Sequence, residues 1–305
     1  MNYSPELTRA LETLRQITGI TMQVKAETPE EEELALTQIR CICSAYQEKY
    51  SRTHFLQGAI TGTLSSYEIL ERAPHFHISV EEPRVLFLIK GKNGLDESAQ
   101  EVLKNLLPIR PKAFLVPLAE DCIALLRSVK ASEPEHTVRR TAHAIIDTLN
   151  TEALTSAQVA YSGTFEALTD CQAAYKSAYL ALKVGSLFYA EQRVFPYNEL
   201  GIGRLIYQLP PDVCVSFLHE LFGSDIPVSL DEETNAVANR FLQNNLNIAE
   251  TSRQLHMHRN TLIYRLDQIQ KRIGLDLRVF EDAMTFKIAS MVMNYLQTER
   301  NSKHE

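Results

Sequence analysis

The clearest pattern in this 305-residue sequence is a helical spacing of apolar side chains near the C-terminus. Leu262, Leu266, Ile269 and Ile273 fall within one narrow stripe at about 100° per residue, which predicts the buried face of a helix. On the opposite side lie Asn260, Tyr264 and Lys271, with Arg259 and Arg265 on the flanks. Gly274 follows the last apolar position and is expected to end the helix.

A second, shorter helix is predicted just before it, over residues 247–255. Asn247 can cap this helix, and Glu250 follows three residues later. A tight turn over residues 256–258, in which His258 caps the next helix, would connect the two. Further helices are expected from a capping box at Ser229-x-x-Glu232 through Leu246, and over residues 280–297. Four helices around one small core, with a short helix, a turn and a longer helix in the middle, have the geometry of a helix-turn-helix.

Charge supports a binding role for this region. Residues 251–278 contain six Lys or Arg and two acids, a net charge of +4, which leaves −11 for the rest of a chain whose total is −7. A basic island in an acidic protein indicates a negatively charged partner, and its outward donors suit phosphates and base edges. Period and charge alone leave open an ordinary helical hairpin with a solvated basic face.

The middle of the chain alternates strand and helix patterns. Strands are expected at residues 84–90, 112–118, 122–129, 157–162 and 193–197, with a hairpin turn at 119–121. Helices are expected at residues 97–107, 136–154 and 170–187. This order predicts an α+β domain, one sheet covered by helices.

The N-terminal part is predicted to be helical, over residues 5–20, from Pro29 to about 64–66, and over 66–73. Within the long helix the residues Leu36, Ile39, Cys43, Tyr46 and Tyr50 step by three or four. This seam has two interpretations, a dimerisation helix or a face packed on the chain's own first helix, because two heptads are too few for a coiled coil.

Residues 247–274, centred on His258-Arg259-Asn260-Thr261-Leu262 and Tyr264-Arg265-Leu266, resemble the C-terminal helix-turn-helix of the sugar-diacid regulator (CdaR) or PucR family of bacterial transcription factors. The runs 174–182 and 199–205 resemble the GGDEF-like domain of the same family. The resemblance implies a multidomain α+β protein with a helical N-terminal segment (1–75), a degenerate GGDEF-like domain (76–200), a helical linker (201–228) and an all-α helix-turn-helix domain (229–305).

The function that this resemblance implies is that of a DNA-binding transcription regulator, an activator of a catabolic operon that responds to a small metabolite such as an organic acid. It would act as a homodimer on double-stranded DNA. The expected DNA-binding residues are His258, Arg259, Asn260, Thr261, Tyr264, Arg265 and Lys271. The roughly 70 residues before the middle domain are fewer than a sugar-diacid sensor needs in the family, so the effector stays open. The alternative is a nucleotide-sensing or protein-interaction module that does not bind DNA.

Enzyme chemistry is not expected. The hairpin at Ala119-Glu120-Asp121-Cys122 lacks the glycines of a true GGDEF cyclase. His256-x-His258 has no third metal ligand nearby, and Gly201-x-Gly203 lacks the third glycine of a dinucleotide site, so we expect no metal and no cofactor. Five scattered cysteines, no secretory signal and no long apolar run predict a cytoplasmic protein with no membrane segment.

Overall fold

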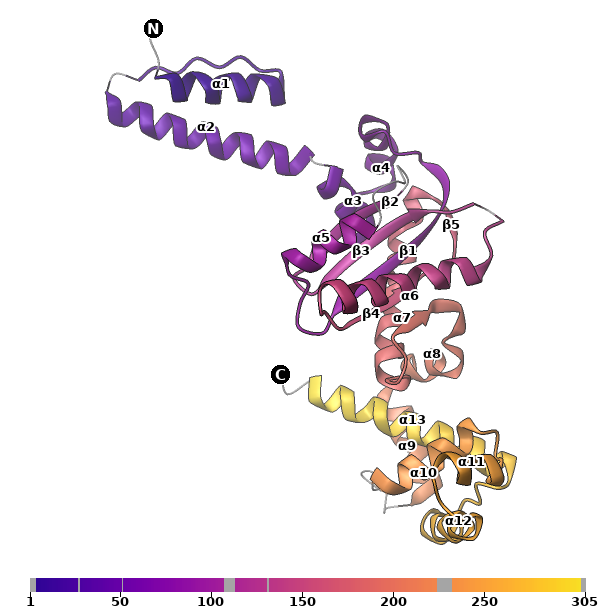
Figure 1. Cartoon of the computed structure of the whole chain (residues 1–305). Coiled ribbons are helices and arrows are strands. Elements are labelled where there is room, and N and C mark those ends of the chain that lie inside the picture. Colours follow the sequence, from indigo (N-terminus) through magenta and orange to yellow (C-terminus); the bar gives the residue numbers. More distant parts are fainter. Residues whose placement is uncertain are drawn as a thin grey trace. The chain divides into compact units, whose positions relative to one another are not determined.

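Figure 1 shows a computed structural model of the chain, which describes residues 4–26, 28–50, 52–106, 113–130, 132–223 and 232–302. The chain divides into two units. The first contains Met1–Leu182 and Arg193–Asn198, and the second contains Lys183–Gln192 and Glu199–Glu305.

The first unit is built on a six-stranded sheet. Its strands are β1 (Glu81–Gly91), β2 (Ala113–Ala119), β3 (Cys122–Ser128), β4 (Ala157–Tyr161), β5 (Phe165–Ala167) and β6 (Val194–Pro196). The order is β2-β3-β1-β4-β6, and β5 also pairs with β1. All pairs are antiparallel except β4 with β6. The central strand, β1, pairs Phe87 with Leu125 on one side and with Tyr161 on the other.

Helices cover both faces of this sheet (Figure 1). One face packs on α5 (Glu97–Leu106) and α6 (Glu135–Glu152), through residues such as Phe87, Leu103 and Ile145. The other face packs on α3 (Arg52–Thr61), α4 (Ser66–Arg72) and α7 (Cys171–Phe188), through residues such as Leu86 and Leu88. Short 3-10 turns lie at Ala73–Phe76, Leu168–Asp170 and Tyr197–Glu199. A strand buried on both faces explains why the pattern of β1 is a continuous apolar run.

The N-terminal helices, α1 (Pro5–Thr18) and α2 (Pro29–Tyr50), pack side by side (Figure 1). The backbone N–H of Ser4 donates to a carboxylate oxygen of Glu32 at 2.6 Å, and Glu6 pairs with Arg40 at 3.7 Å. Residue numbers therefore increase together along the two helices, so the pair is parallel. The segment after Gly19 is the connection between them.

The seam of α2 is occupied by α1. Leu36, Ile39 and Cys43 are buried in one cluster with Leu7 and Leu14 of α1, which confirms the interpretation as packing within the chain for these three positions. Tyr46 is half-buried, and the side chain of Tyr50 lies outside the described residues.

The helix predicted from Pro29 to about 64–66 is wrong in extent. The structure has two helices instead, and α3 ends at Thr61 because Gly62 adopts φ +81°. A Cβ on Gly62 would meet the Gln172 side chain at 1.9 Å, so this turn requires glycine.

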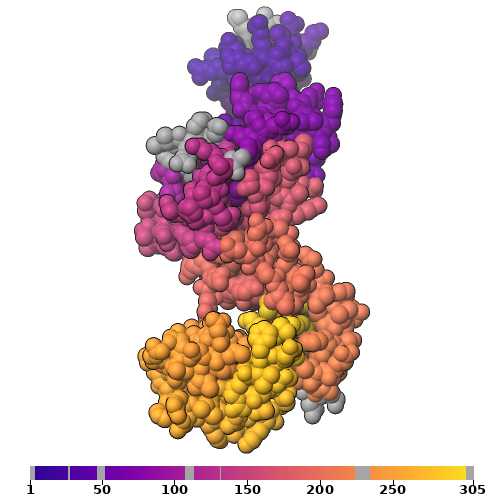
Figure 2. Space-filling model, turned by 90° about the vertical axis from the view of Figure 1, so that its right-hand side faces the viewer, coloured from indigo at the N-terminus to yellow at the C-terminus, as the bar shows by residue number. Residues whose placement is uncertain are grey.

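The second unit is helical. It contains α8 (Gly201–Tyr207), α9 (Pro211–Phe222), α10 (Glu232–Gln243), α11 (Ile248–Gln254), α12 (Arg259–Ile273) and α13 (Phe280–Ser302). In Figure 2 the last helix, in yellow, lies against the orange helices α10–α12. One core joins α10, α12 and α13 through Phe241, Leu266 and Phe286, and a second core joins α8, α9 and α13.

Helices α8 and α9 lie within the segment 201–228, which was expected to be helical. Two other expectations for this unit need correction or fall outside the described residues. Helix α10 ends at Gln243, earlier than predicted, because Asn245 and Leu246 adopt φ +51° and +60°. The capping serine, Ser229, and the last five residues of the predicted linker, 224–228, lie outside the described residues.

Candidate nucleic-acid interface

Helix α11 is fixed at its start by a side-chain cap. The Oδ1 of Asn247 accepts from the backbone N–H of Glu250 at 3.0 Å, as predicted. The Nδ2 of Asn244 donates to Thr251 Oγ1 and to Gln254 Oε1, both at 3.2 Å, which ties the preceding turn to this helix. Thr251 is fully buried, so α11 is fixed both by the cap on its backbone at Asn247 and by this buried side chain.

The turn between α11 and α12 depends on one left-handed residue. His256 adopts φ +51°, and the next backbone N–H, of Met257, donates to the Ser252 carbonyl at 3.0 Å. His258 then caps α12, because its Nδ1 accepts from the backbone N–H of Asn260 at 3.3 Å. The acceptor role requires Nδ1 without a proton, so the neutral imidazole of His258 serves as the N-cap of α12.

Helix α12 has the two faces that the spacing predicted. Leu262 and Leu266 are fully buried, and Ile269 and Ile273 are at most 8% exposed, which confirms the predicted inner face. Gly274 ends the helix at φ +78°, and its N–H donates to the Gln270 carbonyl at 2.8 Å. Because the apolar face of α12 packs in one core with α10 and α13, the opposite face of α12 points to solvent.

The outer face carries most of the predicted DNA-binding residues. Six of the seven are exposed: His258, Arg259, Asn260, Thr261, Tyr264 and Lys271. Tyr264 has 63% of its surface exposed, which is high for an aromatic side chain. We call these six residues the outer ridge. Hydrogen-bond donors, one aromatic ring and two cations are therefore presented together to solvent.

An ion network near the end of α12 was not predicted as part of this face. Arg278 Nη1 lies 2.8 Å from Asp267 Oδ1, and its Nε lies 2.7 Å from Asp276 Oδ1. Hydrogen bonds from the Arg278 side chain hold the pKa of Asp276 below its ordinary value, and Asp276 raises the pKa of Arg278. Arg278 thus offsets the one carboxylate on α12, so the outer ridge stays cationic.

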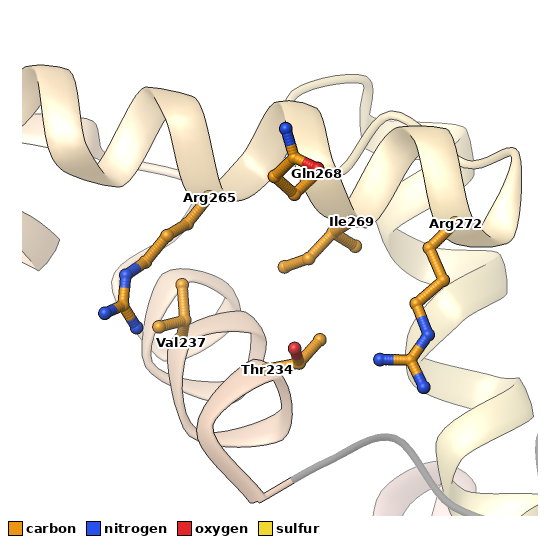
Figure 3. Close-up of a pocket in the computed structure, with 6 residues that line it drawn as sticks. All are labelled: Thr234, Val237, Arg265, Gln268, Ile269 and Arg272. Atoms are coloured by element: carbon orange, nitrogen blue, oxygen red, sulfur yellow. The ribbon is translucent and has the colours of Figure 1, made fainter.

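Arg265, the seventh predicted residue, lies on a different face from Tyr264. It is half-buried on the flank of α12 that faces α10, where it lines a pocket of about 410 Å³ with Thr234, Val237, Gln268, Ile269 and Arg272. Figure 3 shows Arg265 and Arg272 extending toward α10 on either side of Val237 and Thr234, whereas Gln268 points away. Arg265 and Arg272 lie on the same side of α12 because they are seven residues apart, and α10 supplies the other wall of their pocket.

Other candidate chemistry is not assembled. No group of three or more His, Cys, Asp or Glu in the described residues is placed to hold a metal ion. At the β2–β3 turn the Asp121 carboxylate lies 3.4 Å from Lys90 Nζ, and burial raises the pKa of the neighbouring Cys122 thiol to about 11. Within the described ranges no helix combines the length and apolarity needed to cross a bilayer.

Family models match the two regions just described. The model of the PucR C-terminal helix-turn-helix domain matches residues 237–292, and that of the GGDEF-like domain matches residues 61–184. The first match contains α11, the turn and α12. The second contains most of the sheet and the helices on both of its faces.

Three relatives are similar in sequence. The chain is 22% identical to the carbohydrate diacid regulator of Escherichia coli over 84% of this chain and 69% of that protein. It is 36% identical to the uncharacterized protein YxkF of Bacillus subtilis over 21% of this chain, and 26% identical to the purine catabolism regulatory protein of the same organism over 36% of this chain. The last two alignments span only about a fifth of each relative, 20% and 21%.

A solved structure, the regulator of polyketide synthase expression from Bifidobacterium adolescentis, aligns over 83% of this chain and 98% of that one. Its TM-score is 0.39 at 13% identity, a similarity too low to support a shared fold. The GGDEF-like match describes a fold and not a catalytic activity, and both relatives with an assigned role are named as regulators. With a GGDEF-like domain followed by a PucR-type helix-turn-helix, the chain belongs to the PucR/carbohydrate diacid regulator (CdaR) family, a family of transcription regulators and not of enzymes.

Proposed function

We propose that this chain is a DNA-binding transcription regulator, an activator of a catabolic operon that works in the cytoplasm and responds to a small metabolite. The observation that carries the proposal is the arrangement of α12, whose aliphatic face is buried while the outer ridge faces solvent. A helix held this way can enter the major groove of B-DNA and present its N-terminal residues to base edges.

The residues of the outer ridge divide by chemistry. Asn260 and Arg259 are the candidates for base contacts, because an amide can bind adenine and a guanidinium can bind guanine with two hydrogen bonds each. Thr261, Tyr264, His258 and Lys271 suit phosphate and sugar contacts, which position a protein on the duplex without reading sequence. Arg265, on the flank facing α10, is assigned a phosphate contact at the edge of the groove.

One reading helix covers few base pairs, so the proposal includes a homodimer on paired half-sites. The four segments 1–75, 76–200, 201–228 and 229–305 would then serve as dimerisation or sensor segment, GGDEF-like domain, linker and DNA-binding domain. The proposed effector is a small metabolite, with organic acids and purines as the classes to screen. The names of the relatives, which refer to carbohydrate diacids and purine catabolism, suggest regulation of the use of a carbon or nitrogen source.

Gel-shift titrations of the full chain on the DNA upstream of its own gene, at two salt concentrations, test this function. Arg265→Ala should weaken binding and reduce the slope of log K against log salt by about 1, because one phosphate contact by a cation is lost. Arg140→Ala, an exposed arginine on α6, removes the same charge far along the chain from α12 and serves as the matched control. Equal affinity and equal slope for the two variants would refute the assignment.

A further inference from the structure

The pocket between α10 and α12 gathers two arginines around one cavity. Arg265 and Arg272 of α12 line it together with Thr234 and Val237 of α10, and its volume is about 410 Å³. In Figure 3 the Thr234 side chain lies between the two arginines, and both arginines extend toward α10. None of the described residues that line the cavity is acidic. We call this cavity the arginine pocket.

The spacing of Arg265 and Arg272 lets their side chains meet at one point. The two residues are seven positions apart on α12, about 700° of rotation, so both side chains leave the same side of the helix. Seven positions also correspond to a rise of about 10.5 Å along the helix axis. Half of that rise is shorter than an extended arginine side chain. The two guanidinium groups can therefore contact the same small anion in the middle of the pocket.

The chemistry of the lining fits a phosphate group. A guanidinium stays protonated and carries five N–H donors in a planar fork, so an arginine can bind an anion in addition to the contacts that it already makes. Two N–H groups of this fork can bind two oxygens of one phosphate. The hydroxyl of Thr234 supplies another donor. Two fixed positive charges and three donor groups therefore favour an anion over a neutral or cationic ligand.

The arginine pocket continues the outer ridge along one flank of α12. One residue of the ridge and three beyond it step by four, three and four positions: Thr261, Arg265, Gln268 and Arg272. This spacing places them in one row along the helix, about 17 Å long at 1.5 Å per residue. Each strand of B-DNA carries one phosphate for about every 3.4 Å of helix axis. A strand that passes Thr261 therefore has phosphates within reach of the arginine pocket.

We propose that the arginine pocket holds one backbone phosphate of the bound DNA between Arg265 and Arg272, with Thr234 of α10 as a third donor. The inference rests on the proposed function and deepens it, because it adds Arg272 and Thr234 to the DNA contacts and makes α10 part of the interface. It also assigns the flank of α12 along which one DNA strand runs. Phosphate contacts carry no sequence information, so the role of the pocket is to position the outer ridge over the base edges.

Gel shifts of the full chain at several salt concentrations, on its upstream DNA and on an unrelated duplex, test the proposal. Arg272→Ala should weaken binding to both duplexes about tenfold and reduce the slope of log K against log salt by about 1, because a charged contact to a phosphate is lost. The preference for the upstream DNA should stay unchanged, since phosphates do not report sequence. Arg140→Ala, on the exposed arginine of α6, removes the same charge and should bind like wild type.

Two further variants test whether the donors share one phosphate. Thr234→Val removes only the hydroxyl and should weaken binding about threefold. The double variant Arg265→Ala/Arg272→Ala should bind more tightly than the product of the two single losses predicts, because each single variant already breaks the shared contact. Single losses that multiply fully in the double variant would place the two arginines on separate phosphates and overturn the proposal.

Inorganic phosphate distinguishes a DNA contact from a site for a free anion. Thermal unfolding of wild type and of Arg265→Ala/Arg272→Ala is compared in sodium phosphate and in sodium chloride of equal ionic strength. The proposal expects phosphate to raise the midpoint of wild type more than that of the double variant, because an anion bound only by the folded chain stabilises it. The same result together with an unchanged DNA affinity of Arg272→Ala would assign the pocket to a free anion and overturn the proposal.

Failure of this proposal can be told apart from failure of the proposed function. Arg272 is exposed, so Arg272→Ala should unfold at the wild-type midpoint, which excludes misfolding as the cause of weaker binding. If wild type binds DNA and Arg272→Ala keeps its affinity and salt slope, the arginine pocket holds no phosphate while the proposed function stands. If wild type binds neither duplex, the proposed function fails and this proposal fails with it.

Discussion

Two substitutions two residues apart on α12 should have opposite consequences. Leu266→Ala removes a side chain that is fully buried in the core with Val237, Phe241 and Phe286. Tyr264→Ala removes one that is 63% exposed on the outer ridge. The first should destabilise the second unit and leave the DNA-facing residues in place, whereas the second should weaken DNA binding and leave stability nearly unchanged.

The magnitudes follow from burial. Replacing a fully buried leucine by alanine costs about 3 kcal/mol, the lost transfer free energy plus the cavity that remains. Because Leu266 packs in one core with residues of both α10 and α13, the site has little freedom to collapse. For a unit of this size about 3 kcal/mol lowers the midpoint of thermal unfolding by about 10 °C. Replacing the exposed Tyr264 by alanine should change the free energy of unfolding by no more than about 0.5 kcal/mol.

Calorimetric unfolding of the full chain and gel shifts at 10 °C measure both effects on the same samples. At that temperature Leu266→Ala is still largely folded and should bind DNA within about threefold of wild type. Tyr264→Ala should lose about 1 kcal/mol of binding, or about fivefold in affinity, through one phosphate or base contact. If Tyr264→Ala lowered the unfolding midpoint as much as Leu266→Ala, the assignment of the two faces of α12 would be refuted.

Three further outcomes are expected. His258→Ala should cost about 1 kcal/mol in unfolding free energy through loss of the N-cap, and His258→Asn should restore it, which urea unfolding measures. Hydrogen bonds from Arg278 lower the folded-state pKa of Asp276 below its ordinary value of 3.8, so this pair stabilises the fold above that pH. The contribution is lost as the pH falls through the lowered pKa. Arg278→Ala should therefore flatten this part of the stability–pH curve, which acid-unfolding experiments measure. Arg84→Ala should destabilise the first unit by about 3 kcal/mol in thermal melts, because it leaves the Ser79 carbonyl and the Glu82 carboxylate without a buried guanidinium partner.

The sequence predicted the elements whose signal is contained in a single segment. The inner face of α12, the cap at Asn247 and the stop at Gly274 each depend on residues within one or two turns, so periodicity finds them. Strand β1 was found for a similar reason, because burial on both faces produces an unbroken apolar run.

What the sequence missed depends on contacts between segments. Strand β5 has three residues, Phe165–Ala167, and exists only because it pairs with the start of β1. Helix α8 lies in the segment predicted as a helical linker, but its start at Gly201, with φ +51°, has no side-chain cap that the sequence could reveal. Arg265 and Arg272 share one side of α12 by their spacing, but the pocket that they line needs Thr234 and Val237 of α10, more than twenty residues away.

Helix α2 shows where periodic analysis is ambiguous in principle. Its spacing correctly identified an apolar seam but could not say what covers it, since packing on α1 and packing on a second chain require the same residue types. In the structure the connection after Gly19 runs back along α1, so that α2 lies parallel to α1. The apolar seam of α2 therefore packs on α1. The consequence is that any dimer contact on this helix must use the opposite side, where Leu34 and Ile42 are exposed.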